Sequence, residues 1–434
     1  MRKRVIAAAA LAATISLVAA GCSSSGSTSS ASGSTITYWA SNQGTSLDND
    51  KQVLTPVLDD FTKKTGVKVK LEVIGWNDLQ TRIQTAVTSG QGPDVLNIGN
   101  TWAASLQATG AFLPFGDSEM KSIGGSDKFV KTALDTGGAA GKTPTSVPLY
   151  GLAYGLYYNK KMFSDAGVQA PTNWEELVTD AKKLTNGTQY GFSLAAGSYT
   201  ENAHFAFINS AQNGGEWFDS KGNPTFTSSA NVDGIKRYLD LMQTDKVVNT
   251  SNAQYDNGVQ AVNDFATGKV AMILSQNNAD SSINANGMKS DAYGVVPFPS
   301  PEGGKPVASH VAGINLSIFK NTKNKDAALE FVKYMTSEST QSKLAKPYAT
   351  LPVLNGVKPT FTDNADEAAT FQKIYNEMSK PLPLVPAEDQ FENTVGKAMN
   401  DMFAKIATGG TVSDSDIKSA LQNAQDQVKQ SIGG

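Results

Sequence analysis

Cysteine is almost absent from this chain, since Cys22 is the only one among 434 residues, and no disulfide can form within it. Histidine is nearly as scarce: His204 and His310 stand far apart in the sequence, and no cysteine is free to help them bind zinc. Charge is low and balanced, with 37 basic and 40 acidic residues and a net charge of −3. This balance gives no electrostatic indication of nucleic-acid binding.

Long apolar runs are also missing, apart from residues 5–20, which are too few and wrongly flanked to span a membrane as a helix. Arg2, Lys3 and Arg4 precede this run, and small residues close it just before Cys22. The layout is typical of a secretory signal peptide, which we predict for residues 1–21. A cysteine directly after the small residues resembles the lipobox of bacterial lipoproteins, where the thiol carries diacylglycerol. An ordinary signal peptide ending near a cysteine is the alternative.

The segment after Cys22 has no apolar side chain larger than alanine. Such a sequence cannot bury enough surface to offset the entropy of ordering, so residues 22–35 are expected to form a lipidated cysteine and a flexible Ser/Gly tether. Two or three acyl chains are what stable anchoring requires. The sequence therefore predicts a protein on the outer face of the cell membrane, attached through its lipid alone.

Strand and helix patterns alternate beyond the tether, which indicates an α/β fold. Short apolar strands are predicted at residues 36–40, 67–73 and 93–98, with helices at 47–66 and 76–90 between them. Three later helices are also predicted. The first begins with a capping box from Thr172 to Glu175, the second buries Ala328, Phe331, Val332 and Met335, and the third starts at Ser415 and buries Ile417, Leu421, Ala424 and Val428.

Catalytic and cofactor motifs give no positive signal. Residues 136–143 look like a phosphate loop, but Thr136 replaces the first glycine and Pro144 blocks the helix that would follow. Residues 48–52 lack the glycine and glutamate of a calcium loop, and a helix N-cap explains them better. No G-x-S-x-G elbow occurs, and no spacing singles out a pair of carboxylates. We therefore predict a binding protein without cofactor or metal rather than an enzyme.

Residues 148–167 resemble the signature of the bacterial ABC-transporter solute-binding proteins of the maltose-binding-protein-like, carbohydrate type. The core of the signature is present as Gly155-Leu156-Tyr157-Tyr158-Asn159, followed by Phe163 and Asp165. Four further stretches agree in order, at residues 36–44, 89–99, 265–275 and 313–335. Together they extend over nearly the whole chain beyond the tether.

This resemblance implies two α/β lobes with a ligand cleft between them, joined by hinge strands near residues 149–152, 295–299 and 357–367. Neither lobe is then continuous in sequence. The expected division places residues 36–150 and 298–360 in lobe 1, and residues 151–297 and 361–434 in lobe 2.

The resemblance also implies a function. A lipid-anchored monomer would capture a sugar, with an oligosaccharide as the expected form, and deliver it to the permease subunits of an ABC importer. Two alternatives remain open: a cell-surface carbohydrate-processing enzyme, and a lipoprotein that senses a ligand without transporting it. A polyol or another polar solute is a further choice of ligand.

Sugar recognition needs amide or carboxylate groups for the hydroxyls and aromatic faces for stacking. Polar and aromatic residues that follow predicted strands, or match ligand loops of the family, are the candidates. They are Trp39, Asn42, Gln43, Asn100, Thr101, Trp102, Tyr199, Glu201, Gln276, Asn277, Asn278 and His310.

Several of these assignments have a structural alternative. Trp102 could pack on the lobe surface at the start of a helix, and His310 could be an ordinary surface-loop residue. Trp174 and Trp76 are predicted to be structural, because each lies at the start of a helix, and Trp217 is left undecided.

Overall fold

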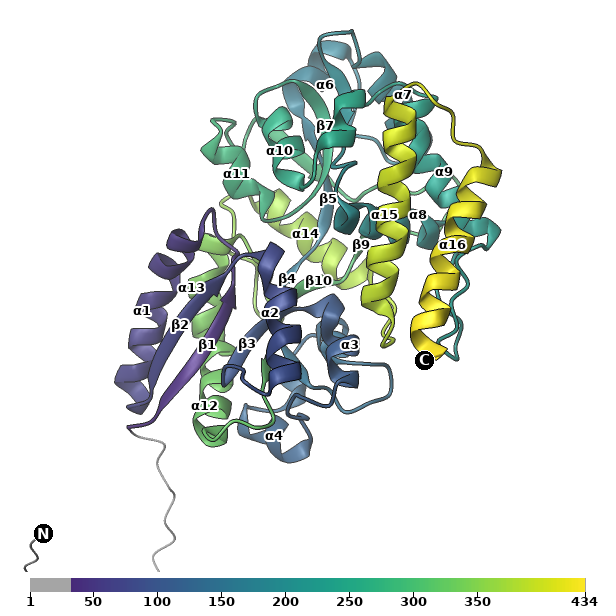
Figure 1. The fold of residues 1–434 in the computed structure, drawn as a ribbon. Coiled ribbons are helices and arrows are strands. Elements are labelled where there is room, and N and C mark those ends of the chain that lie inside the picture. The colour runs from purple at the N-terminus through teal and green to yellow at the C-terminus, as the bar shows by residue number, and fades with distance from the viewer. Residues whose placement is uncertain (1–32, 434) are drawn as a thin grey trace, which may run out of the picture.

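The computed structural model describes residues 33–433, which form two α/β lobes stacked one above the other in Figure 1. The predicted signal peptide, the lipidated Cys22 and most of the predicted tether lie outside the described residues. No helix in the described part of the chain combines the length and apolar character needed to cross a membrane.

Lobe 1 is built on a five-stranded sheet in the order β2-β1-β3-β10-β4. β1 pairs in parallel with β2 and β3, whereas β10 is antiparallel to both of its neighbours. Its strands are β1 (Thr35–Ser41), β2 (Lys68–Ile74), β3 (Val95–Gly99), β4 (Ser146–Leu152) and β10 (Ala312–Ile318). Its helices are α1 (Leu47–Thr65), α2 (Trp76–Ser89), α3 (Ala103–Ala108), α4 (Asp117–Ser122), α5 (Lys131–Leu134), α12 (Lys325–Met335) and α13 (Glu338–Tyr348).

The two faces of this sheet are covered by different helices. Tyr38 of β1 packs against Phe331 of α12, which also contacts Phe61 of α1. On the opposite face, Ile83 of α2 is buried in a separate apolar cluster with Leu96 of β3. The alternation of side chains along each strand therefore produces two cores, one on each side of the sheet.

Lobe 2 contains a four-stranded sheet in the order β6-β7-β5-β8. β5 is antiparallel to β7 and β8, and β6 runs parallel to β7. Its strands are β5 (Tyr154–Asn159), β6 (Tyr190–Ser193), β7 (Val270–Gln276) and β8 (Tyr293–Val296). Its helices are α6 (Lys160–Ala166), α7 (Trp174–Lys183), α8 (Tyr199–Gln212), α9 (Ser229–Gln243), α10 (Gly258–Ala266), α11 (Ala279–Ala285), α14 (Ala365–Glu377), α15 (Glu388–Ala407) and α16 (Asp414–Gly433).

The chain passes between the lobes at three places. Ala153 separates β4 from β5, residues 297–311 connect β8 to β10, and residues 349–364 connect α13 to α14. A short ladder of β9 (Ser309–His310) and β11 (Ser379–Lys380) lies at this junction. The second connection contacts lobe 2, because Phe298 packs against Trp174 at 5.8 Å between ring centroids. The exact lobe boundaries given above stay predictions.

Helix faces predicted from periodicity are confirmed, because the apolar stripes of α12 and α16 are buried in the core. Two predicted caps are wrong. The N-cap of α7 is Asn173 rather than Thr172, and its side chain accepts from the Glu176 amide. The N-cap of α1 is Ser46, so residues 48–52 lie inside the first turns of the helix. In both cases a neighbouring Asn or Ser side chain reaches the free amide group.

Candidate functional site

A cavity of about 210 Å³ lies between the lobes and receives side chains from both. A larger hollow of about 670 Å³ is lined only by residues 390–427 of lobe 2, so it does not join the lobes. Most of the ligand residues predicted from the sequence line the interlobe cavity. They are Gln43, Asn100, Thr101, Trp102, Tyr199, Glu201, Gln276, Asn278 and His310.

The lobe 1 wall of the cavity is aromatic and amide-rich. A 3-10 turn, η1 (Asn100–Trp102), follows β3 directly and brings Asn100 and Trp102 to the cavity. Asn100 is buried, and its amide donates to the carbonyl of Val311 at 2.8 Å. The Trp102 ring meets the ring of Trp76 edge to face at 5.6 Å.

Trp76 corrects a prediction made from the sequence. Its place at the start of a helix predicts a structural role, but 36% of its surface is exposed and it lines the cavity. Trp76 is the first residue of α2, and the adjacent end of β2 directs it toward η1. Its partner Trp102 also packs on the apolar cluster beneath α2, while its contact with a ligand stays a prediction.

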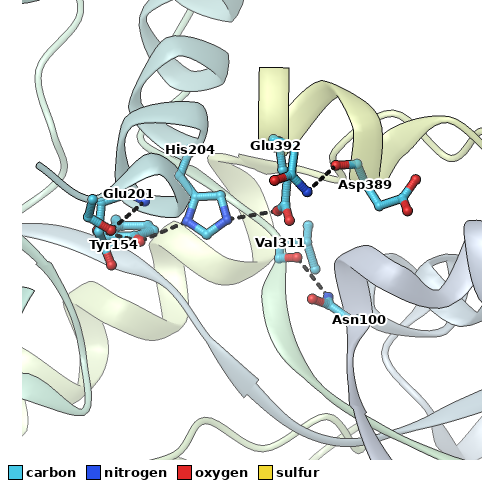
Figure 2. Close-up of polar contacts among 9 residues, drawn as sticks. Asn100, Tyr154, Glu201, His204, Val311, Asp389 and Glu392 are labelled. Atoms are coloured by element: carbon cyan, nitrogen blue, oxygen red, sulfur yellow. Dashed lines mark hydrogen bonds and ion pairs between the residues drawn. The ribbon is translucent and has the colours of Figure 1, made fainter. Parts of the chain in front are cut away.

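The lobe 2 wall carries a row of polar side chains (Figure 2). The Tyr154 hydroxyl donates to Glu201 Oε2 at 2.8 Å and lies 3.0 Å from His204 Nδ1. The other ring nitrogen of His204 is 3.1 Å from Glu392 Oε1. Ser198 caps α8 by accepting from the Glu201 amide, which places Glu201 in the first turn of that helix and His204 in the second. We refer to Glu201, Tyr154, His204 and Glu392 as the polar row.

His310 is buried beside this row and is not a surface-loop residue. Its ring centroid is 4.2 Å from that of His204, and only 1% of its surface is exposed. Burial, and then the neighbouring His204, hold the pKa of His310 well below its usual value. Across the described residues, no group of three or more His, Cys, Asp or Glu side chains is arranged to hold a metal ion.

Carboxyl groups near the polar row are strongly affected by burial. Burial raises the pKa of Glu201, against the opposing effects of His204 and the Tyr154 hydroxyl. On α15, burial and the adjacent Glu392 raise the pKa of Glu388 well above its usual value. Burial also raises the pKa of Asp389. This side of the cavity is therefore acidic and poorly solvated.

Trp39 and Asn42 do not line the cavity, although both were predicted to bind ligand. The Trp39 ring lies 4.6 Å from the guanidinium of Arg82 on α2 and packs against the apolar cluster beneath that helix. The Asn42 amide donates to Asp50 at 2.5 Å and to the Gly44 carbonyl at 3.0 Å. Asp50 also accepts from the Gly44 amide at 2.8 Å. This network fixes the loop that presents Gln43 to the cavity.

Asn277 is also outside the cavity, because its side chain is used in the hinge. Its Oδ1 accepts from the Ala153 amide at 2.8 Å, and its Nδ2 donates to the Ala349 carbonyl. The Asn277 backbone amide in turn donates to the Ala153 carbonyl at 3.0 Å. Asn277 thus joins the first and third connections between the lobes to the end of β7.

Sequence reasoning missed Thr200, His204 and Glu392 in the lobe 2 wall, and the last two of these are titratable. A signal for Glu392 was present: Glu388 and Glu392 interrupt the buried face of α15 that also contains Phe391 and Val395. A carboxylate in a buried helical stripe needs a partner or a function. His204 carried no such signal, because its partners come from segments distant in sequence.

The sequence pattern of the family described as bacterial extracellular solute-binding protein matches residues 44–342. The chain belongs to this family. Among curated solute-binding relatives, the diacetylchitobiose binding protein DasA of Streptomyces coelicolor is 26% identical over 369 residues, covering 83% of this chain and 82% of that protein. The mannitol-binding protein of Pseudomonas aeruginosa is 25% identical over 387 residues, covering 84% and 87%.

Solved solute-binding proteins share the fold. An ABC transporter solute-binding protein from Thermotoga lettingae, bound to alpha-D-tagatose, superposes with a TM-score of 0.78 at 22% identity, covering 91% of this chain and 100% of that one. The GacH receptor of Streptomyces glaucescens, known with and without acarbose, gives a TM-score of 0.76 at 23% identity, covering 91% and 98%. These likenesses establish the two-lobe architecture.

Proposed function

We propose that this protein captures a sugar or related polyol between its lobes and delivers it to an ABC importer. The observation that carries the proposal is the interlobe cavity, which combines the Trp76 and Trp102 rings with amide and carboxyl groups. Aromatic faces bind the C–H patches of a sugar, and the polar groups bind its hydroxyls. Members of the same family are named for binding diacetylchitobiose, mannitol and multiple sugars, which supports this class of ligand.

Both lobes contribute to the cavity, which supports a mechanism of closure on the ligand. A ligand favours the closed state only through contacts that the open state lacks. Here a sugar would touch η1 of lobe 1 and α8 of lobe 2 at once. The hinge around Asn277 would allow the lobes to move while remaining joined. The closed, loaded form would then be the one that the permease subunits recognise.

The sugar is held and released without chemical change in this proposal. Export through the signal peptide of residues 1–21, anchoring through Cys22 and a monomeric state belong to the same hypothesis. They would place the cavity at the outer face of the membrane, beside the importer. Cys22→Ser should leave the affinity for ligand intact and release the protein into the medium. Retention of this variant in the membrane fraction would contradict the anchor.

Calorimetric titration against a panel of sugars and polyols tests the proposed function. A ligand at 100 times its Kd should stabilise the folded protein by about 2.7 kcal/mol, which a thermal-shift screen detects first. Scattering should then show a smaller radius of gyration with the bound sugar than without it. Recovery of the ligand unchanged after long incubation separates binding from carbohydrate processing. Release of reducing ends would instead favour an enzyme.

A further inference from the structure

The lobe 2 wall of the cavity includes two carboxyl groups, Glu201 and Glu392, and two more lie beside Glu392 on α15. Glu201, Glu388, Asp389 and Glu392 are grouped on α8 and the first turns of α15. Within residues 33–433, none of them forms an ion pair with lysine or arginine, and His204 is the one basic side chain that contacts a member of the group. Figure 2 shows Glu201, Glu392 and Asp389 along this side, with Asn100 facing them from lobe 1.

With the Glu201 carboxyl ionised, as a bound counter-charge would favour, the hydrogen bonds of the polar row leave it one net negative charge. With the Tyr154 hydroxyl donating to Glu201, the hydrogen of His204 Nδ1 must point to the Tyr154 oxygen. The hydrogen bond between His204 Nε2 and Glu392 Oε1 then contains one proton, which is either on the nitrogen or on the carboxyl group. In the first case one imidazolium faces two carboxylates, and in the second a neutral imidazole leaves Glu201 ionised. Both arrangements carry one net negative charge.

A buried net charge is costly unless a counter-charge or solvent accompanies it. The residues that line the cavity include neither lysine nor arginine. Lys397 of α15 comes near, with its Nζ 5.8 Å from the Tyr199 ring centroid, but it lines the separate hollow on lobe 2. The lining therefore offers no lysine or arginine to balance these carboxyl groups, and among the described residues His204 is their one basic partner.

His310 provides an independent indication that a ligand completes this wall. It lines the cavity and is almost fully buried, yet its Nδ1 has no hydrogen-bond partner. Buried polar atoms normally have a partner, so an unsatisfied one beside a cavity marks a place for a ligand group. On the opposite wall stand the rings of Trp76 and Trp102, and the π-face of such a ring attracts cations as well as sugar C–H groups.

We infer that the ligand is an amino sugar or an aminated polyol, whose protonated amine binds beside Glu201 and Glu392 while its carbon skeleton packs against Trp102. This inference rests on the proposed function and narrows it. The ammonium group would supply the missing positive charge, and its N–H donors would reach the carboxylates and the free nitrogen of His310. A neutral sugar would fill the same space and leave the charge of the polar row uncompensated.

Calorimetry with matched pairs of ligands tests the inference. The pairs are D-glucosamine and D-glucose, glucamine and sorbitol, and the disaccharide of glucosamine and cellobiose, all measured at neutral pH. We expect the aminated member to bind about tenfold more tightly or better in at least one pair, as a charge-assisted hydrogen bond would provide. The preference should shrink as salt is raised, because screening weakens the added interaction.

The possible outcomes separate the inference from the proposed function. Neutral members that bind as tightly as their aminated partners would overturn the inference and leave sugar binding in place. If no member of the panel binds, the inference and the sugar proposal both fail.

Substitution of Glu392 adds a second test. Glu392→Gln keeps the shape and can still accept from His204, but it removes the charge, so the preference for the aminated member should fall about tenfold. The neutral member should lose much less. Glu330→Gln, at an exposed site on α12 in lobe 1, is the matched control and should keep the preference. An unchanged preference in Glu392→Gln, with a normal denaturation midpoint, would overturn the inference.

Discussion

The two walls of the cleft differ in chemistry. Lobe 1 contributes Gln43, Asn100, Thr101 and the two tryptophans, none of which titrates near neutral pH. Lobe 2 contributes the polar row, with His310 beside it. One wall therefore provides stacking and fixed hydrogen bonds, and the other provides charge that depends on pH and on the ligand. Under the proposed function and the inference drawn from it, lobe 1 would recognise the shape of the ligand and lobe 2 its charge.

Removing a ring from the lobe 1 wall should have the largest effect on binding. Trp102→Ala should weaken the affinity for the identified ligand by about 2–4 kcal/mol, because it removes an aromatic contact at the centre of the site. Calorimetry measures this loss, and the denaturation midpoint without ligand is the control. A lowered midpoint with near-normal affinity would mean that Trp102 mainly supports the cluster beneath α2.

The hinge between the walls can be tested through Asn277. Asn277→Ala would leave the Ala153 amide and the Ala349 carbonyl without their buried partner, and should lower the free energy of unfolding by roughly 2–3 kcal/mol. Asn278→Ala is the matched control, because Asn278 lines the cavity and, unlike Asn277, does not use its side chain to bind the hinge backbone. It should alter affinity rather than stability. Lost affinity with unchanged stability in Asn277→Ala would instead place Asn277 in the ligand site.

Lobe 2 should lose stability in alkali. Burial, and then the nearby Asp280, raise the pKa of Glu367 on α14 to about 8. A raised pKa means that the folded state holds its proton more tightly, so this stability is lost as pH rises toward the folded value. We expect a loss of roughly 2–3 kcal/mol between pH 6 and pH 9. Glu367→Gln should flatten that part of the stability curve; an unaltered slope would contradict the assignment.

Lobe 1 should show the opposite and smaller pH dependence. Asp94 is partly buried, which favours its neutral form, but hydrogen bonds from Thr322 and Thr37 outweigh this and lower its pKa. Its stabilising effect is therefore present at neutral pH and lost as pH falls through the folded value. The free energy of unfolding should fall between pH 7 and pH 3, and Asp94→Asn should make this fall smaller by less than about 1 kcal/mol, since the site is half open to solvent. Urea denaturation at pH 3 and pH 7 measures the difference.

The sequence predicted the parts of the site that depend on local pattern. η1 could be anticipated because polar residues and Trp102 follow a buried strand, and the apolar stripes of the helices were visible from their spacing. The polar row could not, because His204 meets Glu392 across 188 residues and its contact with His310 depends on the packing of α8 beside β9. Asn277 looked like its neighbours in sequence, and only the arrangement of the hinge strands distinguishes it.

The place of β10 in lobe 1 has a consequence for the order in which the protein folds. β10 lies between β3 and β4, and its Ile314 pairs with Gly99, which is far away in the sequence. Every strand of the lobe 2 sheet precedes β10 in the chain. An emerging polypeptide can therefore complete the second sheet while the first still lacks the strand between β3 and β4, whose facing edges stay unpaired. Unpaired strand edges invite association with other chains, and distant pairings form slowly. Refolding should thus show early protection of lobe 2 amides, with those of β3 protected last.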